Sequence, residues 1–210
     1  MKNAERTETR KNEILDAAEQ LFNEKGYEET TINDILSVSG VAKGSLYYHY
    51  NSKEDVLDGI VGRMTEQIVT AVRAVADDPA LTGHEKMVRV IPSMNVAGSP
   101  DDAMLNELHR PSNALLHQKS IAGTIEAVAP IIAGVVEQGI REGTYSTRFP
   151  LETVEVLLVA GQYIFGEGIF KRTPDEATAR MAAFIGITEK LLGAEEGSFG
   201  FLTGGSNNGK

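Results

Sequence analysis

The 210-residue sequence contains no cysteine and no tryptophan. Without cysteine, the chain has no disulfide framework, no thiolate metal site and no cysteine nucleophile. Aromatic residues make up only 6% of the sequence, which is low for a carbohydrate-binding or β-sandwich protein. The longest apolar runs, at 127–136 and 156–166, are shorter than the roughly 18 residues of a membrane span. We therefore expect no membrane partner.

Positive charge is also scarce. The net charge of −10 argues against a protein that coats nucleic acid indiscriminately, although it leaves room for a small positive face. Residues 1–53 have a net charge of −2 and the remainder −8, so most of the acidity follows residue 53. The N-terminus lacks the apolar core of a secretory signal, and we expect a cytoplasmic protein.

Most of the sequence follows the helical period. Apolar residues recur on one face of the first helix, at Ile14, Leu15, Ala18, Leu21 and Phe22. A hydroxyl followed three positions later by a carboxylate, which is typical of a helix start, recurs at Thr31, Ser52, Thr82, Ser99 and Thr173. Strand and hairpin signals are poor. The sequence predicts an all-α fold, with helices near 9–25, 32–39, 43–49, 53–76, 83–97, 101–118, 120–142, 151–171 and 174–193.

The composition changes near residue 53. Short helices, turn residues and a Tyr/His cluster precede this point, and longer helices rich in Ala, Val, Ile and Gly follow it. The last fifteen residues hold five glycines and show no periodicity. We expect a first domain at 1–53, a larger helical domain at 54–195 and a flexible Gly-rich tail at 196–210.

The segment 30–53 is the most informative. It predicts two short helices joined by a tight turn, in which Gly40 supplies the positive φ that such turns often need. This is the helix-turn-helix layout, whose second helix enters the major groove of DNA. The second helix ends in Tyr47-Tyr-His-Tyr50, and four such rings cannot all face the core of so small a unit. Exposed hydroxyls close to Lys43 and Lys53 suit contacts with phosphate.

This segment resembles the DNA-binding domain of the TetR family of bacterial transcriptional regulators. The matching residues cover nearly all of 10–60, and they are Ile14-Leu-Asp-Ala-Ala18, Leu21-Phe22, Gly26-Tyr27, Thr30-Thr31-Ile32, Ile35, Gly40-Val41, Lys43-Gly44-Ser45-Leu46-Tyr47, His49-Tyr50, Ser52-Lys53-Glu54 and Leu57. The rest of the chain matches in layout only, with a long helix ending Gln138-Gly-Ile-Arg-Glu-Gly143 and two helices after it.

The resemblance implies which residues bind DNA. Contacts with phosphates and base edges fall to Thr31, Lys43, Gly44, Ser45, Tyr47, Tyr48, His49 and Lys53. Ala42 departs from the family pattern, which often has a hydroxyl residue at this position. A capping or phosphate contact is therefore lost there.

Several of these assignments have structural alternatives. Gly44 is also consistent with a loose helix start, Tyr47 with a half-buried core ring and Lys53 with a solvated helix start. We expect Tyr50 to pack against the first helix. The basic residues near the N-terminus form either a flexible arm that reaches DNA or a solvated terminus, and they are Arg6, Arg10 and Lys11.

The resemblance also implies a homodimer, in which the final two helices of each chain form a shared four-helix bundle. Apolar stripes on those helices supply the expected interface residues Val154, Leu158, Gly161, Phe165, Met181, Phe184, Ile185, Thr188 and Leu192. The alternative is that the two helices bury these faces against each other within one chain. Two-fold pairing suits the reading of DNA, because one short helix contacts few base pairs and two half-sites about 34–36 Å apart add specificity.

The middle helices of the family enclose an effector pocket. Candidate lining residues are Met87, Ile91, Met94, Met104, Leu108, His109, Leu116, His117, Tyr163 and Phe170, although a Met stripe more often marks a core. The two histidines of this set are eight positions apart, too far for the usual metal-binding pair. We expect no metal and no cofactor.

Enzyme motifs are weak. The Gly-rich matches lack a preceding strand or a Lys-Ser/Thr pair, and there is no G-x-S-x-G elbow. The sequence therefore predicts a ligand-responsive transcriptional regulator, a repressor released from double-stranded operator DNA by an unknown small-molecule effector. The alternatives are a helical ligand-binding or interaction module without specific DNA binding, and a small helical enzyme.

Overall fold

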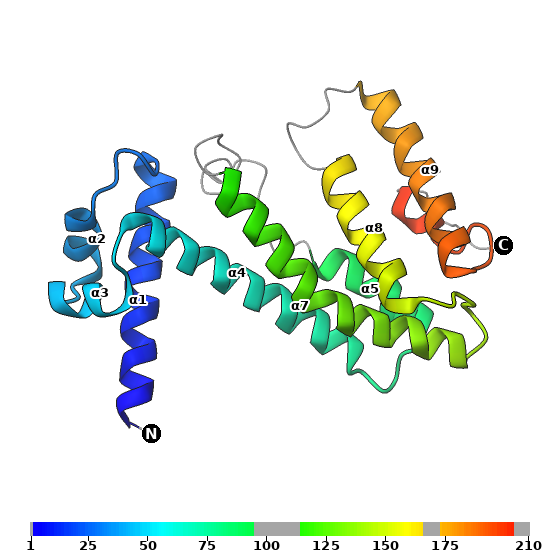
Figure 1. The fold of residues 1–210 in the computed structure, drawn as a ribbon, viewed down its shortest axis with the longest axis horizontal. Helices are drawn as coiled ribbons and strands as arrows, with labels where there is room; N and C mark the ends of the chain where they lie inside the picture. Colours follow the sequence, from blue (N-terminus) through cyan, green and yellow to red (C-terminus); the bar gives the residue numbers. More distant parts are fainter. Residues whose placement is uncertain (1, 95–113, 166–172, 204–210) are drawn as a thin grey trace. The chain divides into compact units, whose positions relative to one another are not determined.

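The computed structural model describes residues 2–94, 114–165 and 173–203. Every regular element in these residues is helical, and the prediction of an all-α fold is confirmed. The elements, drawn in Figure 1, are α1 (Lys2–Lys25), α2 (Ile32–Ser39), α3 (Lys43–His49), α4 (Lys53–Ala76), α5 (Gly83–Ser93), α7 (Ala114–Arg141), α8 (Pro150–Phe165), α9 (Pro174–Leu192) and the 3-10 helix η2 (Gly200–Thr203). The residues predicted as helical at 95–97, 101–113 and 166–171 lie outside the described residues.

Two compact units make up the chain. The N-terminal unit comprises residues 1–67 and 96–120, and the C-terminal unit comprises residues 68–95 and 121–210. The change in composition near residue 53 marks the start of α4, whereas the division between the units falls inside that helix. The reason is that Val56, Leu57 and Ile60 at the start of α4 are fully buried in the N-terminal core.

The core of the N-terminal unit is built on the predicted stripe of α1. Ile14, Leu15 and Phe22 on this helix are at most 1% exposed. Ile35 of α2 and Leu46 of α3 pack into the same cluster and are fully buried. Three short elements are thus held by one shared core, which is the helix-turn-helix arrangement expected from the sequence.

The helix starts follow the predicted capping pattern. Thr31, Thr82 and Thr173 each cap a helix, with the hydroxyl accepting a backbone N–H three residues later and the carboxylate at that position accepting the N–H of the threonine. The backbone N–H of Asp55 donates to the Ser52 hydroxyl at the start of α4. The fifth signal, at Ser99, lies outside the described residues.

The C-terminal unit is formed by the second half of α4 together with α5, α7, α8 and α9. Its core includes the fully buried residues Val72 of α4, Val128 and Val136 of α7, and Leu192 of α9. The predicted break near residue 119 is wrong, because α7 runs without interruption through Lys119-Ser120. Neither glycine nor proline stands there to end the helix.

The expectation of a flexible tail from residue 196 is wrong for its first half. Phe199 is fully buried, and its ring lies 5.3 Å from the ring of His84 and 6.3 Å from that of Tyr145. Its backbone N–H donates to the carboxylate of the buried Glu189 at 2.9 Å. The buried Phe199 side chain therefore anchors the Gly-rich segment from residue 196 up to η2. Residues 204–210 lie outside the described residues.

The segment Leu116–Arg141 of α7 is, by length and composition alone, apolar enough to cross a membrane, with a mean hydropathy of 1.5. Its buried residues, which include Val128, Ile132 and Val136, pack in the core of the C-terminal unit. A core helix passes the same test as a membrane span, so this property gives no argument for a membrane location.

Candidate nucleic-acid interface and ligand cavity

Helix α3 divides its side chains between the core and the surface. Leu46 is fully buried and Tyr50, just after the helix, is 6% exposed, whereas Tyr47 is 45% and Tyr48 78% exposed. The inward position expected for Tyr50 is therefore confirmed, and burial raises its pKa to about 12. The core fixes α3 through Leu46 and Tyr50, and the other rings remain outside it.

The start of α3 confirms the consequence expected from Ala42. Its methyl group makes no capping hydrogen bond, so the helix begins without a side-chain cap. The turn before it contains Gly40 with φ of +65°, the left-handed conformation that favours glycine. Lys43 and Gly44 are exposed at this end of the helix, and a Cβ at Gly44 would meet nothing within 4 Å.

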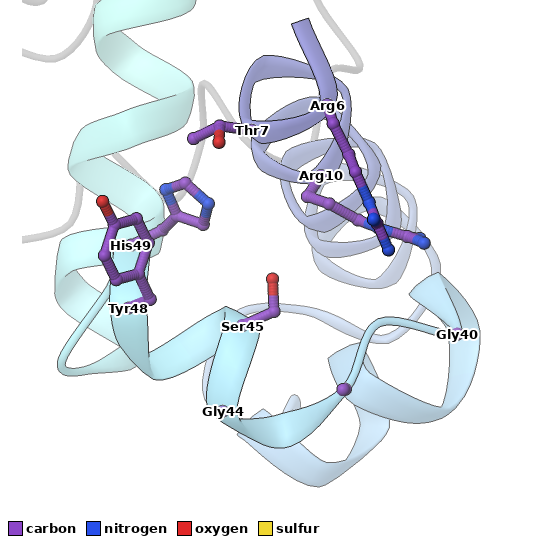
Figure 2. A pocket seen from close by; sticks show the side chains of 9 residues that line it. Arg6, Thr7, Arg10, Gly40, Gly44, Ser45, Tyr48 and His49 are labelled. Atoms are coloured by element: carbon purple, nitrogen blue, oxygen red, sulfur yellow. The ribbon is translucent and has the colours of Figure 1, made fainter. Parts of the chain in front are cut away.

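An open groove of about 690 Å³ lies between α1 and α3. Figure 2 shows Arg6, Thr7 and Arg10 of α1 along one side of it, with Ser45 and other residues of α3 opposite. Both guanidinium groups extend in the same direction, toward the turn that precedes α3. These arginines belong to a helix that begins at Lys2, so the alternative of a flexible arm is wrong for them. The groove is also lined by Gly40, Ala42, Gly44, Tyr48 and His49.

The charges in and beside this groove are partly compensated. The guanidinium of Arg10 forms an ion pair with Glu13 at 2.6 Å. Lys43 extends over the ring of Tyr47, with 5.9 Å between its Nζ and the ring centroid. Arg6 is exposed on the same helix one turn before Arg10. The groove therefore carries positive charge on an otherwise acidic chain.

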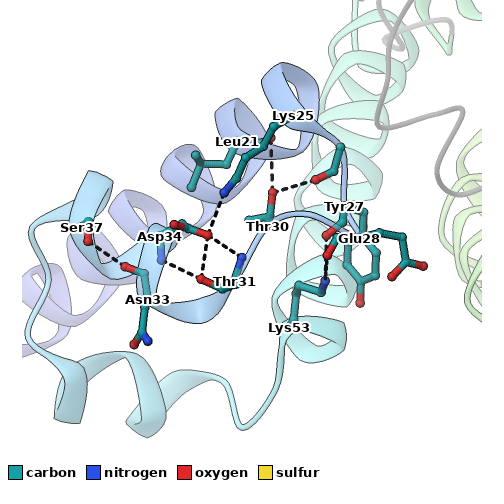
Figure 3. Close-up of polar contacts among 11 residues, drawn as sticks. Leu21, Lys25, Tyr27, Glu28, Thr30, Thr31, Asn33, Asp34, Ser37 and Lys53 are labelled. Carbon is teal, nitrogen blue, oxygen red and sulfur yellow. Dashed lines mark hydrogen bonds and ion pairs between the residues drawn. The ribbon is translucent and has the colours of Figure 1, made fainter.

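Thr31 sits in a dense polar network at the start of α2, drawn in Figure 3. The carboxylate of Asp34 accepts hydrogen bonds from the Thr31 hydroxyl at 2.7 Å and from the Lys25 ammonium at 2.8 Å. These contacts, with that of Lys25 the largest, hold the pKa of Asp34 well below its usual range. Thr31 therefore has a structural role, and its contact with phosphate stays a prediction.

Lys53 has structural partners that the sequence did not reveal. Its ammonium donates to the backbone carbonyls of Tyr27 at 2.7 Å and Glu28 at 3.3 Å, as Figure 3 shows. The same ammonium lies 4.2 Å from the centroid of the Tyr27 ring. A contact between residues 26 positions apart leaves no local pattern in a sequence, which explains why it was missed. The phosphate role of Lys53 stays a prediction.

The C-terminal unit contains a cavity of about 340 Å³ between α5, α7, α8, α9 and η2. Met87 and Ile91 of α5, and Met94 directly after this helix, line the cavity, as expected for ligand-binding candidates. Tyr163 is not among the residues that line this cavity and is 42% exposed on α8, so its contact with a ligand stays a prediction.

The remaining ligand candidates do not line this cavity within the described residues. Leu116 packs against the core of the N-terminal unit instead, which corrects its expected place. His117, next to it on α7, is partly buried. The other four lie outside the described residues, and they are Met104, Leu108, His109 and Phe170. The described residues contain no group of three or more His, Cys, Asp or Glu placed to hold a metal ion.

The apolar stripes expected to form the dimer interface face the interior of the single chain. Val154 and Ile185 are at most 5% exposed, and the ring of Phe165 lies 5.3 Å from that of Phe184. Thr188 and Leu192 are buried, and Leu158, Gly161, Phe165, Met181 and Phe184 line the cavity. Intrachain packing therefore accounts for the four buried residues, and the place of all nine in a dimer interface stays a prediction.

A different set of apolar side chains is exposed on the same two helices. Val156 is 58% and Val159 44% exposed on α8, with Tyr163 one turn further along. Ile187 is 53% and Leu191 42% exposed on α9. Their spacings of three or four residues place each group on one helical face. We call these residues the outer faces of α8 and α9.

Comparisons with known proteins agree with a helix-turn-helix unit that is followed by a second helical unit. A family model described as "Bacterial regulatory proteins, tetR family" matches residues 14–60, and one described as "Tetracyclin repressor-like, C-terminal domain" matches residues 97–187. The chain is 31% identical over 157 residues to the fatty acid metabolism regulator protein of Bacillus subtilis, covering 73% of this chain and 77% of that protein. It is 38% identical over 66 residues to the transcriptional repressor KstR2 of Rhodococcus jostii, covering 31% and 32% of the two chains.

Solved structures show the same fold. The structure of SmeT, the repressor of the Stenotrophomonas maltophilia multidrug efflux pump SmeDEF, matches with a TM-score of 0.59 and 19% identity, covering 90% of this chain and 92% of that one. With a helix-turn-helix unit, a second helical unit and relatives that match most of its length, the chain belongs to the TetR family of bacterial transcriptional regulators, whose general mode is ligand-responsive repression.

Proposed function

We propose that this protein is a homodimeric repressor that binds operator DNA through α3 and leaves it when a small molecule occupies the cavity of the C-terminal unit. The observation that carries the proposal is the division within α3, where Leu46 is fully buried and Tyr48 is 78% exposed. A helix that is anchored by buried residues on one side and exposed to solvent on the other is suited to enter a major groove of DNA. Binding to operator DNA implies a cytoplasmic protein, which is part of the proposal.

The exposed residues of the N-terminal unit have distinct proposed roles. Lys43, Gly44 and Ser45 contact base edges and nearby phosphates from the start of α3, where the missing Cβ at Gly44 allows close approach. Tyr47, Tyr48 and His49 reach the sugar–phosphate backbone or base edges, and Thr31 and Lys53 bind phosphates from the neighbouring helix starts. Arg6 and Arg10 add positive charge along the groove beside α3.

The outer faces of α8 and α9 are the proposed dimer contact. Their apolar residues Val156, Val159 and Ile187 are left exposed by the described part of the chain. A second copy would bury them in an isologous four-helix contact. The resulting pair of α3 helices would read two half-sites.

The effector and the operator are proposed to oppose each other through α4. This helix belongs to both units, since its start lies in the N-terminal core and Val72 lies in the C-terminal core. Arg63 on α4 forms ion pairs with Asp16 and Glu19 of α1, which fasten the helix to the DNA-binding unit. A ligand that repacks the C-terminal unit would shift α4, and a reciprocal coupling of about 1–3 kcal/mol is typical of such systems.

Fluorescence anisotropy with a labelled duplex taken from the DNA flanking the protein's own gene tests the proposal. We expect binding about 10³-fold or more tighter than to a shuffled duplex of equal length, with affinity falling as salt rises. Tyr48→Ala should weaken binding, whereas Phe149→Ala, which removes a 62% exposed ring from the C-terminal unit, should not. Equal affinity for the two duplexes, or none for either, would favour a ligand-binding module without specific DNA binding.

Light scattering tests the dimer separately. Ile187→Glu places a charge on the outer face of α9, and we expect it to convert a dimer into a monomer. Phe149→Glu is the matched control, because this exposed ring lies outside both helices. An Ile187→Glu protein that remains dimeric would remove α9 from the interface.

A further inference from the structure

The lining of the C-terminal cavity is almost entirely apolar. It includes three methionines, at positions 87, 94 and 181, and two phenylalanines, at positions 165 and 184. Among the described lining residues, only Gln162 and Thr188 have amide or hydroxyl groups, and none is charged. A charged ligand group among these side chains would lose its hydration without gaining a partner.

The two polar residues have different places in this cavity. The Thr188 hydroxyl donates to the backbone carbonyl of Phe184 at 2.9 Å, so only its lone pairs remain for a ligand. Gln162 is exposed although it also lines the cavity, so it marks the side that opens to solvent. Its amide can both donate and accept. A ligand with one polar end would place that end at Gln162 and its apolar part inside.

The cavity extends along α8. Its lining on α8 runs from Val154 to Phe165, which corresponds to about 16 Å of helix at 1.5 Å per residue. A lining that extends this far along one helix suits an extended, flexible chain better than a compact ring system. Methionine side chains adapt readily to such a chain.

The C-terminal segment closes one wall of the cavity. Leu202 of η2 lines it, and the same segment is anchored by the fully buried Phe199. The position of Leu202 is therefore set by the contacts of Phe199 with His84 and Glu189. Because this side chain lies in the lining, it limits the space available to a ligand.

We infer that the cavity binds an unbranched aliphatic chain, with the chain inside and the polar end group of the ligand at Gln162. The inference rests on the proposed ligand-responsive function and names the class of effector. A fatty acid, a fatty alcohol and a fatty acyl thioester all carry such a chain. They differ only in the group that lies at the open side.

Isothermal titration calorimetry on the full chain without DNA tests the inference. Decan-1-ol and adamantan-1-ol have the same number of carbons and one hydroxyl each, but only the first is an extended chain. We expect decan-1-ol to bind at least tenfold more tightly. Affinity across straight-chain alcohols should rise roughly fourfold per methylene until the cavity is full. Equal binding of the two ten-carbon alcohols, or no dependence on chain length, would overturn the inference.

Two variants locate the binding. A Cβ at Gly161 would lie 3.6 Å from the ring of Phe184, so Gly161→Leu fills the cavity and should weaken decan-1-ol binding at least tenfold. Gly134→Leu is the matched control, because a Cβ there meets nothing within 4 Å and the residue lies outside this cavity. Leu202→Ala enlarges the cavity and should move the optimum to a longer chain. An unchanged optimum in Leu202→Ala, or equal affinities in the two glycine variants, would contradict this location.

A further comparison identifies the end group. Decanoic acid, decan-1-ol and decanoyl-coenzyme A share one chain length, and the tightest of the three shows which head group the open side accepts. If all three fail to bind, the aliphatic-chain inference is wrong. Operator binding, measured by anisotropy, would still stand in that case. If they bind but no operator is found, the proposed repressor function fails alone.

Discussion

The two units of this protein use apolar side chains in different ways. The N-terminal unit packs Leu46, Ile35 and Phe22 into a core in which all three are at most 1% exposed. The C-terminal unit has a core of its own, but leaves an apolar cavity of about 340 Å³ beside it. A surface that reads DNA has to be held in a fixed shape, whereas a unit that takes up a ligand has to keep volume free. We therefore expect a rigid N-terminal unit and a C-terminal unit that keeps free volume for a ligand.

The largest expected effect on stability comes from replacing one leucine by alanine in each unit. Leu46→Ala leaves a new cavity in a filled core and should lower the free energy of unfolding by about 2–5 kcal/mol. Leu158→Ala only widens a cavity that already exists, so we expect a loss of less than about 2 kcal/mol. Urea denaturation of both variants measures the difference. Equal losses of unfolding free energy in the two variants would contradict the distinction between a filled N-terminal core and a C-terminal unit with a cavity.

The salt dependence of DNA binding tests the positive groove of the N-terminal unit. Arg6→Gln removes one cation from the groove, and the slope of log K against log salt should become shallower by about 0.9 if this cation neutralises one phosphate. Arg148→Gln, in the loop before α8, removes an equal charge from the C-terminal unit and should leave the slope unchanged. Anisotropy titrations between low and physiological salt give both slopes. A parallel change in the two variants would mean that only net charge matters.

The caps of α2 and α9 have the same hydrogen-bond pattern, so the effects of removing them on stability can be compared. Thr31→Ala and Thr173→Ala each remove a capping hydroxyl and should each cost about 1 kcal/mol of stability. The first cap includes a carboxylate with a lysine partner, since Lys25 donates to Asp34. Since the pKa of Asp34 is lowered in the folded protein, its contribution is complete above its ordinary pKa of 3.8 and declines as the pH falls below that value. Stability measured from pH 5 to pH 2 should therefore fall less steeply in Asp34→Asn.

Two buried tyrosines give the smallest expected effects. No hydrogen-bond partner is found for the Tyr50 hydroxyl within the described residues, whereas the Tyr145 hydroxyl lies 2.9 Å from Nδ1 of His84. Tyr50→Phe should be neutral or slightly stabilising, and Tyr145→Phe should cost about 0.5–1.5 kcal/mol. Thermal unfolding of both variants measures the difference. A larger loss for Tyr50→Phe would reveal a partner for its hydroxyl.

Local patterns in the sequence predicted the helices, their caps and the division of α3. They work there because the signals are local: the capping box at Thr31 spans four residues, and the stripe of α1 repeats within one helix. The inward position of Tyr50 followed from the limited space in a small unit. The resemblance to the family, rather than a local pattern, pointed to Met87 and Ile91, which line the cavity.

Non-local contacts account for the features that the sequence did not predict. An apolar stripe on α8 or α9 shows that one face is buried, but it does not show whether the cover belongs to the same chain. Phe199 stands among glycines, and its contacts with His84 and Tyr145 join residues that are far apart in the sequence. The bond from Lys53 to the Tyr27 carbonyl is of the same kind. Such contacts depend on the finished fold and leave no periodic signal.

The central claim is that paired α3 helices read DNA, and hydroxyl-radical footprinting on the duplex flanking the protein's own gene tests it most directly. The account predicts two protected half-sites related by a two-fold axis, centred about one helical turn or a whole multiple of it apart. Both half-sites should be lost together in Tyr48→Ala and kept in Phe149→Ala. A single unsymmetrical protected tract, or protection that survives Tyr48→Ala unchanged, would contradict the account.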